Sequence, residues 1–222
     1  MTRTNWAAIT AVVLALLFAG AATVASAGRE DSPRASVTPT ADSADAGFAR
    51  DMAVHHQQAV EMSFLVRDST DDEEVRRLAY DIANTQANQR GMLLGWLDMW
   101  KLPKISTDQE PMAWMARDGG HAGMEGMDHG AHEVRDGSLM PGMATKTELE
   151  ALRTAKGEKA EILYLQLMTD HHKGGVTMAE GCAELCEVDT ERALAEGMVS
   201  AQQSELDLMA DLLKARGAKP RT

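Results

Sequence analysis

The 222-residue chain is poor in three kinds of residue, and each shortage excludes a class of protein. Two cysteines are too few for a fold that depends on a framework of disulfides. Nine aromatic residues (four Trp, two Tyr and three Phe) and six prolines fit a small all-β sandwich poorly. Only 22 basic residues stand against 34 acidic ones, so the net charge is −12. This charge argues against nucleic acid and anionic membrane surfaces as partners, and it suits a protein that handles cations.

The N-terminal segment, residues 1–27, is predicted to be a secretory signal peptide. An uncharged, largely apolar run over residues 7–24 follows a single arginine, and an Ala-Ser-Ala cleavage pattern comes directly after it. The alternative is an uncleaved membrane anchor, because the run is long enough to span a bilayer. Residues 28–46 are rich in Ser, Pro, Thr, Ala and Asp and are predicted to be a disordered linker. We therefore expect an extracytoplasmic protein, which is secreted or at the cell surface after cleavage, or anchored if the segment stays.

The remaining domain, residues 47–216, is predicted to be an internal duplication in which residue n corresponds to residue n + 116. The correspondence runs without gaps over about forty residues. Two His-His pairs coincide in it, and so do the methionines that flank them. The matched positions are His55 with His171, His56 with His172, Met52 with Met168, and Met62 with Met178. A chance origin for two such matched sets is improbable, so the domain is predicted to consist of two related halves.

Each half is predicted to be a helical hairpin, the first over residues 47–101 and the second over residues 147–216. Apolar residues recur at spacings of three and four in both halves, which is typical of one helix face. Thr70 is expected to cap the second helix of the first hairpin, and a short extra helix is expected before Gly157. Two hairpins together predict an all-α four-helix bundle. The His pairs would then meet across the core, provided that the first helices of the two halves are neighbours.

The connection between the hairpins, residues 102–146, is a glycine-rich loop that holds many of the 15 methionines. Thioether sulfur is a soft ligand that suits Cu(I), and imidazole suits Cu(II), Zn and Ni. The loop is therefore predicted to bind a metal ion, with copper or silver ahead of zinc. The alternative is a polar linker whose methionines are incidental. The candidate ligands are His121, Met124, Met127, His129, His132, Met140 and Met143.

The two His pairs are the second candidate metal site. Adjacent residues on a helix point about 100° apart, so one histidine of each pair faces inward and the other lies toward the edge. The alternative is structural: the imidazoles are hydrogen-bonded to Gln86 and Gln202 across the core. Spacing alone does not decide between the two. The candidate ligands are His55, His56, Met52, Met62, His171, His172, Met168 and Met178.

Cys182 and Cys186 form a separate pair near the end of a predicted helix. Four residues apart on a helix, their Cα atoms are about 6 Å apart, within disulfide range although the side chains are not well aimed. A disulfide, two free thiols and a soft dithiolate copper site all remain open. The first half has Val66 and Thr70 at the corresponding positions, so the cysteines are not part of the duplicated pattern.

Several segments resemble the domain-of-unknown-function 305 family. The resemblance is carried by DMAVHHQQAVEM and LMTDHHKGGVTMAEG, by IANTQANQRGML and MVSAQQSELDLM, and by the MPGM stretch at residues 140–143. It covers about residues 47–215 and implies an exported protein with a ferritin-like helical bundle, in a family of which some members are linked to copper binding and copper tolerance. The first half departs from the family pattern at Gln57-Gln58 and at Arg90.

No enzyme motif accompanies these features. No Glu-x-x-His of the di-iron type lies on a predicted helix, and there is no nucleotide loop, Gly-x-Ser-x-Gly elbow or His-Glu-x-x-His. We therefore expect a protein that is not an enzyme and whose partner is a metal ion, copper above all, which it sequesters or delivers. A metal-free helical interaction module with an unknown protein partner is the alternative, and a metal-dependent redox enzyme is the second alternative.

Overall fold

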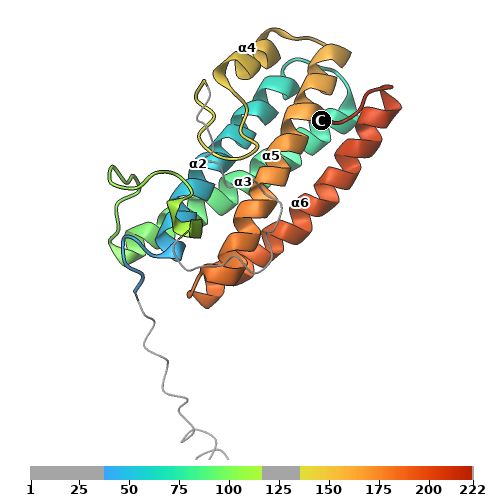
Figure 1. The fold of residues 1–222 in the computed structure, drawn as a ribbon. Helices are drawn as coiled ribbons and strands as arrows, with labels where there is room; N and C mark the ends of the chain where they lie inside the picture. Colours follow the sequence, from blue (N-terminus) through green and yellow to red (C-terminus); the bar gives the residue numbers. More distant parts are fainter. Residues whose placement is uncertain (1–37, 117–135, 222) are drawn as a thin grey trace, which may run out of the picture. The chain divides into compact units, whose positions relative to one another are not determined.

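The computed structural model describes residues 38–116 and 136–221, so the predicted signal peptide lies outside the described residues. Within these two ranges the chain is all-helical, with five α-helices, one short 3-10 turn and no strand, which confirms the predicted class. None of these helices is both long and apolar enough to cross a membrane. The elements are α2 (Ala44–Arg67), α3 (Glu73–Trp100), η1 (Ala113–Ala116), α4 (Lys146–Thr154), α5 (Glu158–Leu185) and α6 (Asp189–Ala215) (Figure 1).

Side-chain caps set the starts of the two helices of the first half. Ser43 accepts a hydrogen bond from the Ala46 amide, so α2 begins at Ala44 rather than at the expected residue 47. The expected cap at Thr70 is wrong, because Asp72 caps α3 by accepting from the Val75 amide at 2.9 Å. Thr70 is used elsewhere, since its hydroxyl donates to the Glu161 carboxylate.

The expected short helix is α4, and its boundary with α5 follows from one glycine. Thr145 and Glu148 form a capping box at the start of α4. Gly157 then has a φ of +57°, a conformation that favours glycine, and its amide donates to the Ser69 carbonyl at 2.8 Å. The chain therefore turns sharply after α4, and α5 begins at Glu158.

The first helices of the two halves are neighbours, which is the condition under which the two histidine pairs were expected to meet. Helix α2 packs against α3, α5 packs against α6, and α2 also packs against α5 (Figure 1). Helices α2 and α5 are antiparallel. Asp45 near the start of α2 accepts from the Val188 amide beyond the end of α5, whereas the Ser63 and Tyr164 hydroxyls meet at 3.1 Å near the other end.

The buried core consists of two hydrophobic clusters, one toward each end of the α2–α5 pair. One cluster contains Met62 and Met168, and the other contains Met52 and Met178. All four side chains are fully buried. The duplication matches Met52 with Met168 and Met62 with Met178, so it exchanges the two clusters. This relation indicates a pseudo-two-fold axis near the crossing of α2 and α5, where the paired histidines lie.

Candidate metal centre

The four paired histidines come together where α2 crosses α5, and all four have an exposed fraction of 0%. The ring of His55 stacks on that of His171, with centroids 3.7 Å apart and planes at 30°. His56 lies 6.5 Å from His55, and His172 lies 6.4 Å from His171, measured between ring centroids. The inward histidine of each pair thus contacts its counterpart directly.

Most of the ring nitrogens in this cluster have no hydrogen-bond partner. His171 Nε2 lies 3.0 Å from the His55 carbonyl oxygen, and His172 Nε2 lies 2.6 Å from a Glu205 carboxylate oxygen. The other six of the eight nitrogens are buried and form no hydrogen bond of good geometry, namely both of His55, both of His56, and Nδ1 of His171 and of His172. The nearest polar groups are the Pro141 backbone beside His55 and the Gln89 side chain beside His56. Buried polar atoms are nearly always satisfied, so six unsatisfied nitrogens in one place require an explanation.

The expected hydrogen bonds from Gln86 and Gln202 to the histidines are not formed. Both amide atoms of Gln202 and the carbonyl oxygen of Gln86 are themselves buried without a partner. Glu205 partners His172 instead, and the amide of Gln89, its counterpart in the first half, lies near His56. The sequence contained the signal for this pair, because Glu205 aligns with Gln89 and follows Gln202 by three residues on the predicted stripe of α6.

Burial keeps the imidazoles of His55, His56 and His171 neutral. It is the largest cause that lowers the pKa of His55 and of His56 to about 3, and it also lowers the pKa of His171 well below its ordinary value. Repulsion between neighbouring imidazolium charges adds to the effect. A neutral imidazole has a free lone pair, which is the form that binds a metal ion.

The segment Met140–Met143 lies against α5 beside this cluster. Gly142 has a φ of +76°, and a Cβ atom there would come within 2.2 Å of the Asp170 carbonyl oxygen. A Cβ atom on Gly174 would come within 2.0 Å of the Pro141 carbonyl oxygen. Both glycines are therefore needed for this close approach. Met140 is buried in the cluster of Met52 and Met178, and Met143 is half-buried.

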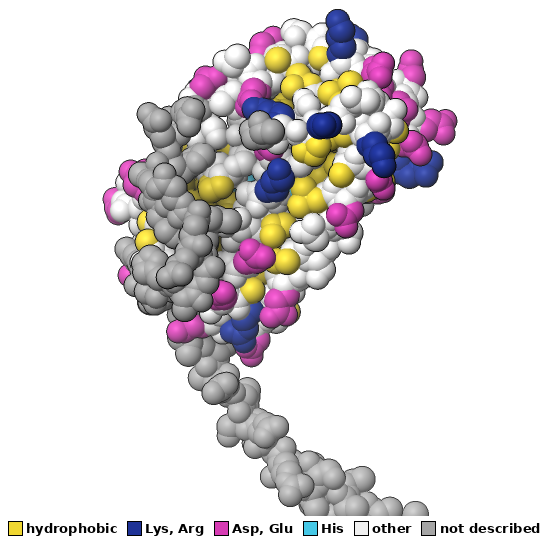
Figure 2. Space-filling model, turned by 45° about the vertical axis from the view of Figure 1, so that its right-hand side comes forward, with side chains coloured by type: hydrophobic (Ala, Val, Ile, Leu, Met, Phe, Trp, Pro, Cys, Tyr) yellow, Lys and Arg dark blue, Asp and Glu magenta, His cyan; other side chains and the backbone are white. Residues whose placement is uncertain are grey.

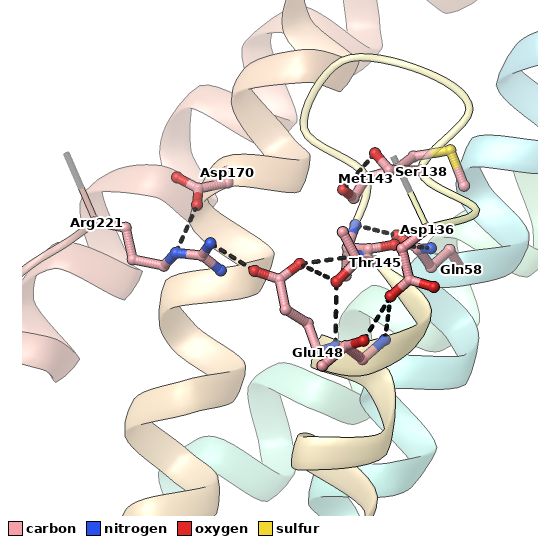
Figure 3. Close-up of polar contacts among 10 residues, drawn as sticks. Gln58, Asp136, Ser138, Met143, Thr145, Glu148, Asp170 and Arg221 are labelled. Atoms are coloured by element: carbon pink, nitrogen blue, oxygen red, sulfur yellow. Dashed lines mark hydrogen bonds and ion pairs between the residues drawn. The ribbon is translucent and has the colours of Figure 1, made fainter. Parts of the chain in front are cut away.

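Helix α2 holds the same segment from the other side (Figure 3). The Gln58 amide donates to the Ala144 carbonyl at 2.9 Å, and the Ala144 amide donates back to Gln58 Oε1 at 2.7 Å. Ser138 donates to the Met143 carbonyl at 2.8 Å. Gln58 corresponds to Gly174 in the duplication. Gly174 leaves room for Pro141, whereas Gln58 binds Ala144 through its side-chain amide. This difference is a structural reason for the departure from the family pattern at Gln58.

The remaining predicted site residues fall into two groups. Cys182 and Cys186 form a disulfide in the structure, which is one of the three alternatives. Their Cα atoms are 4.8 Å apart, closer than on a regular helix, at the point where α5 ends at Leu185. The loop candidates His121, Met124, Met127, His129 and His132 lie outside the described residues.

Comparison with known proteins identifies the family. The sequence model described as "Domain of unknown function (DUF305)" matches residues 45–213. The chain belongs to the DUF305 family. This confirms the resemblance drawn from the sequence, and the match includes both halves of the duplication. No protein of curated function matches the chain.

Solved structures of DUF305 proteins have a similar fold. A candidate secreted DUF305 protein from Streptomyces coelicolor is 60% identical, with a TM-score of 0.71, over 82% of this chain and 99% of its own. A DUF305 fragment from Deinococcus radiodurans is 25% identical, with a TM-score of 0.59, over 78% and 96%. CopM in its Cu(I)-bound form is 19% identical, with a TM-score of 0.55, over 77% and 96%, and at that identity the likeness concerns the fold alone.

The described part of this DUF305 protein has no histidine at its surface. Acidic and basic side chains surround a band of hydrophobic ones on the face shown in Figure 2, where histidine scarcely shows. The four described histidines are all inside, at the centre of the helical domain. Any metal bound by them would be enclosed by α2, α5 and the segment Met140–Met143.

Proposed function

We propose that this protein binds copper outside the cytoplasmic membrane and sequesters or delivers the ion without turning over a substrate. The observation that carries the proposal is the set of six unsatisfied ring nitrogens where α2 crosses α5. The scaffold we propose is a ferritin-like four-helix bundle. Export is supported by the predicted signal peptide and by the similar protein from Streptomyces coelicolor, which is described as a candidate secreted protein.

The chemistry of the centre favours copper over harder ions. Neutral imidazoles lie between two clusters that each hold two of the flanking methionines, and thioether together with imidazole suits Cu(I) and silver. Carboxylates, which magnesium and calcium need, are represented beside the histidines by Glu205 alone among the contacts described. Structures of CopM, which has the same fold, include Cu(I)-bound, Cu(II)-bound and silver-bound forms.

Access to the buried histidines would require movement of the segment Met140–Met143. The residue directly after it, Ala144, is attached to α2 by the paired hydrogen bonds of Gln58, which are short but few. Met140 and Met143 are soft ligands on this segment, so they could pass an ion inward as it opens. The loop residues from His121 to His132 remain the predicted point of capture from solution.

The first experiment titrates the purified mature chain with Cu(I) against a coloured competing chelator. Met168→Leu removes a buried sulfur while conserving volume, and it should weaken Cu(I) binding by about tenfold. The matched control is Met99→Leu, because Met99 is 75% exposed and outside the proposed centre. Equal affinities of the two variants would remove the flanking methionines from the site.

The second experiment separates the helical centre from the loop. One variant replaces Met124, Met127, His129 and His132 with Ala, and another replaces His55 and His171 with Gln. We expect the loop variant to retain tight Cu(I) binding and the histidine variant to lose it. The reverse result would place the site in the loop. No binding tighter than micromolar by the wild type would favour the metal-free interaction module, and copper-dependent oxidase activity would favour the redox enzyme.

A further inference from the structure

A second cluster of metal-ligand side chains lies at the end of the domain where α2 begins and α5 gives way to α6 (Figure 1). One ligand atom each of Asp45, Cys186 and Glu191 lies within 4.8 Å of the other two. All three residues are buried, with exposed fractions of 2%, 2% and 0%. These side chains play no part in the proposed copper centre.

Glu191 is the unusual member of this cluster. Both of its carboxylate oxygens are buried, and the polar side chain beside them is the Asp45 carboxylate, which cannot donate to a charged carboxylate. Asp45 is fixed in place, because its Oδ1 accepts from the Glu187 amide at 3.0 Å and from the Val188 amide at 2.8 Å. No Lys or Arg of the described residues forms an ion pair with either carboxylate. Two buried carboxylates without a counter-charge are costly, so a proton or a bound cation must accompany them.

At the opposite end of the domain, the residues that correspond to this cluster in the duplication can be compared with it. Glu161 corresponds to Asp45, and Thr70 corresponds to Cys186. The Arg216 guanidinium lies 2.7 Å from a Glu161 carboxylate oxygen, and the Thr70 hydroxyl donates to the other oxygen. A side-chain cation therefore neutralises the buried carboxylate at that end. At the Asp45 end none of the described basic side chains pairs with the carboxylate, and the Cys186 sulfur occupies the position that corresponds to the Thr70 hydroxyl.

We propose that Asp45, Glu191 and Cys186 bind a thiophilic divalent cation of the Zn²⁺ and Cd²⁺ class once the Cys182–Cys186 disulfide has been reduced. Disulfide sulfur is a poor ligand, whereas a thiolate with two carboxylates is a ligand set that Zn²⁺ accepts, a water molecule completing the tetrahedron. The bond to Cys182 thus controls the site. The proposal is independent of the copper centre, which uses other residues.

The step that opens the site needs a dithiol reductant. A thiolate of the reductant attacks one sulfur of the disulfide, and the second thiol of the reductant then displaces that sulfur. Two electrons pass to the protein, the reductant becomes a disulfide, and each cysteine sulfur is released as a thiolate that takes up a proton. On binding, the cation displaces the protons of Cys186 and Glu191, which pass to solvent.

The test titrates the full mature chain with Cd²⁺, before and after reduction with a dithiol that is then removed under anaerobic conditions. The readout is the ultraviolet charge-transfer band of a cadmium–thiolate bond, which imidazole and thioether sites do not produce. We expect this band in the reduced chain only. Glu191→Gln should weaken the binding by about tenfold or more, whereas Glu187→Gln, an exposed neighbour, should leave it unchanged.

Two cysteine variants keep the test decisive, with circular dichroism as the check on folding. Cys182→Ser leaves Cys186 as a free thiol, so this variant should bind Cd²⁺ without any reductant. Cys186→Ser should show no band under any condition. The proposal is overturned if the reduced wild type gives no band, if Glu191→Gln binds as tightly as Glu187→Gln, or if the band persists in Cys186→Ser.

Discussion

The two ends of the helical domain correspond in the duplication, yet they neutralise their buried carboxylates in opposite ways. At one end Arg216 lies 2.7 Å from Glu161 and 3.0 Å from Asp72, so the buried negative charge has a permanent partner. At the other end burial and the neighbouring Asp45 charge raise the pKa of Glu191 to about 9, so this carboxyl keeps its proton at neutral pH. The negative charge of a buried carboxylate is thus neutralised by a proton on Glu191 at one end and by the Arg216 guanidinium at the other.

The difference shows which part of the duplicated pattern the two copies share. The histidine pairs and their flanking methionines are the same in both halves, and they lie at the centre, near the pseudo-two-fold axis. Away from the axis the halves differ: Thr70 stands against Cys186, and Arg216 has no cationic counterpart beside Asp45. The two halves therefore share the histidine centre, and they differ at the two ends of the domain.

The largest expected effect is the pH dependence of stability that the central histidines cause. In metal-free buffer the free energy of unfolding should fall as the pH drops from about 6.5 toward 3. The folded chain keeps His55 and His56 neutral, with pKa values of about 3, whereas the unfolded chain takes up protons near pH 6.5. Each such histidine contributes about 1.4 kcal/mol for each pH unit. Urea unfolding at several pH values measures the slope, and a slope that His55→Gln leaves as steep contradicts the assignment.

Arg216→Met should produce the largest effect at either end. The substitution leaves Glu161 buried without its cation, which should cost about 3–5 kcal/mol of unfolding free energy. Arg221→Met is the control, because the Arg221 side chain is 40% exposed and its ion pairs should be worth at most about 1 kcal/mol. Chemical denaturation of both variants gives the comparison. Similar losses in the two would mean that the buried pair at this end has no special role.

Glu191→Gln tests the opposite end and should have the opposite sign. Because the pKa of Glu191 is raised in the folded chain, the wild type loses stability as the pH rises from about 4.5 to about 9. A neutral glutamine removes this loss, so the variant should be more stable than the wild type by about 3 kcal/mol at pH 7. Thermal unfolding in the presence of a chelator provides the measurement. A variant less stable than the wild type would show that Glu191 is charged when folded.

Thr70→Val should have the smallest effect of this series. It removes the hydroxyl that donates to Glu161 and accepts from the Asp72 amide, while the Arg216 ion pair stays in place. We expect a loss of about 1.5 kcal/mol, typical of a hydrogen bond to a charged group. Thr70→Ser retains the hydroxyl and should lose less than half as much. Equal losses would show that the methyl group contributes as much to stability as the hydroxyl does.

The centre of the molecule was predictable because its signal is local and repeated. The 116-residue offset places His55 opposite His171 once the two halves pack, and the structure has them in ring contact. Helix periodicity gave α3, α5 and α6 in the same way. The sequence did not show which polar groups would pair, since whether Gln86 and Gln202 reach the histidines depends on side-chain directions across the core.

The ends were harder to predict, because the residues that meet there are far apart in the sequence. Asp45 lies at the start of α2 and Glu191 at the start of α6. The antiparallel packing of α2 and α5 brings them together, and no spacing rule connects them. The chemical state of Cys186 was left among three alternatives for a related reason. Whether it could reach Cys182 depended on where α5 ends, and element boundaries are the least certain part of a sequence-based prediction.

The near-symmetry of the centre also bears on how metal ions can be counted. An ion on the pseudo-two-fold axis, between His55 and His171, would be held by both halves and would contribute one equivalent. An ion off the axis, beside Met52 and His56, would have a counterpart beside Met168 and His172, so such ions come in pairs. Gln58 and Gly174 make the two counterparts unequal, because the segment they contact lies on the chain once. In a copper titration, an ion on the axis would therefore count as one equivalent, and ions off the axis would count as two distinguishable equivalents.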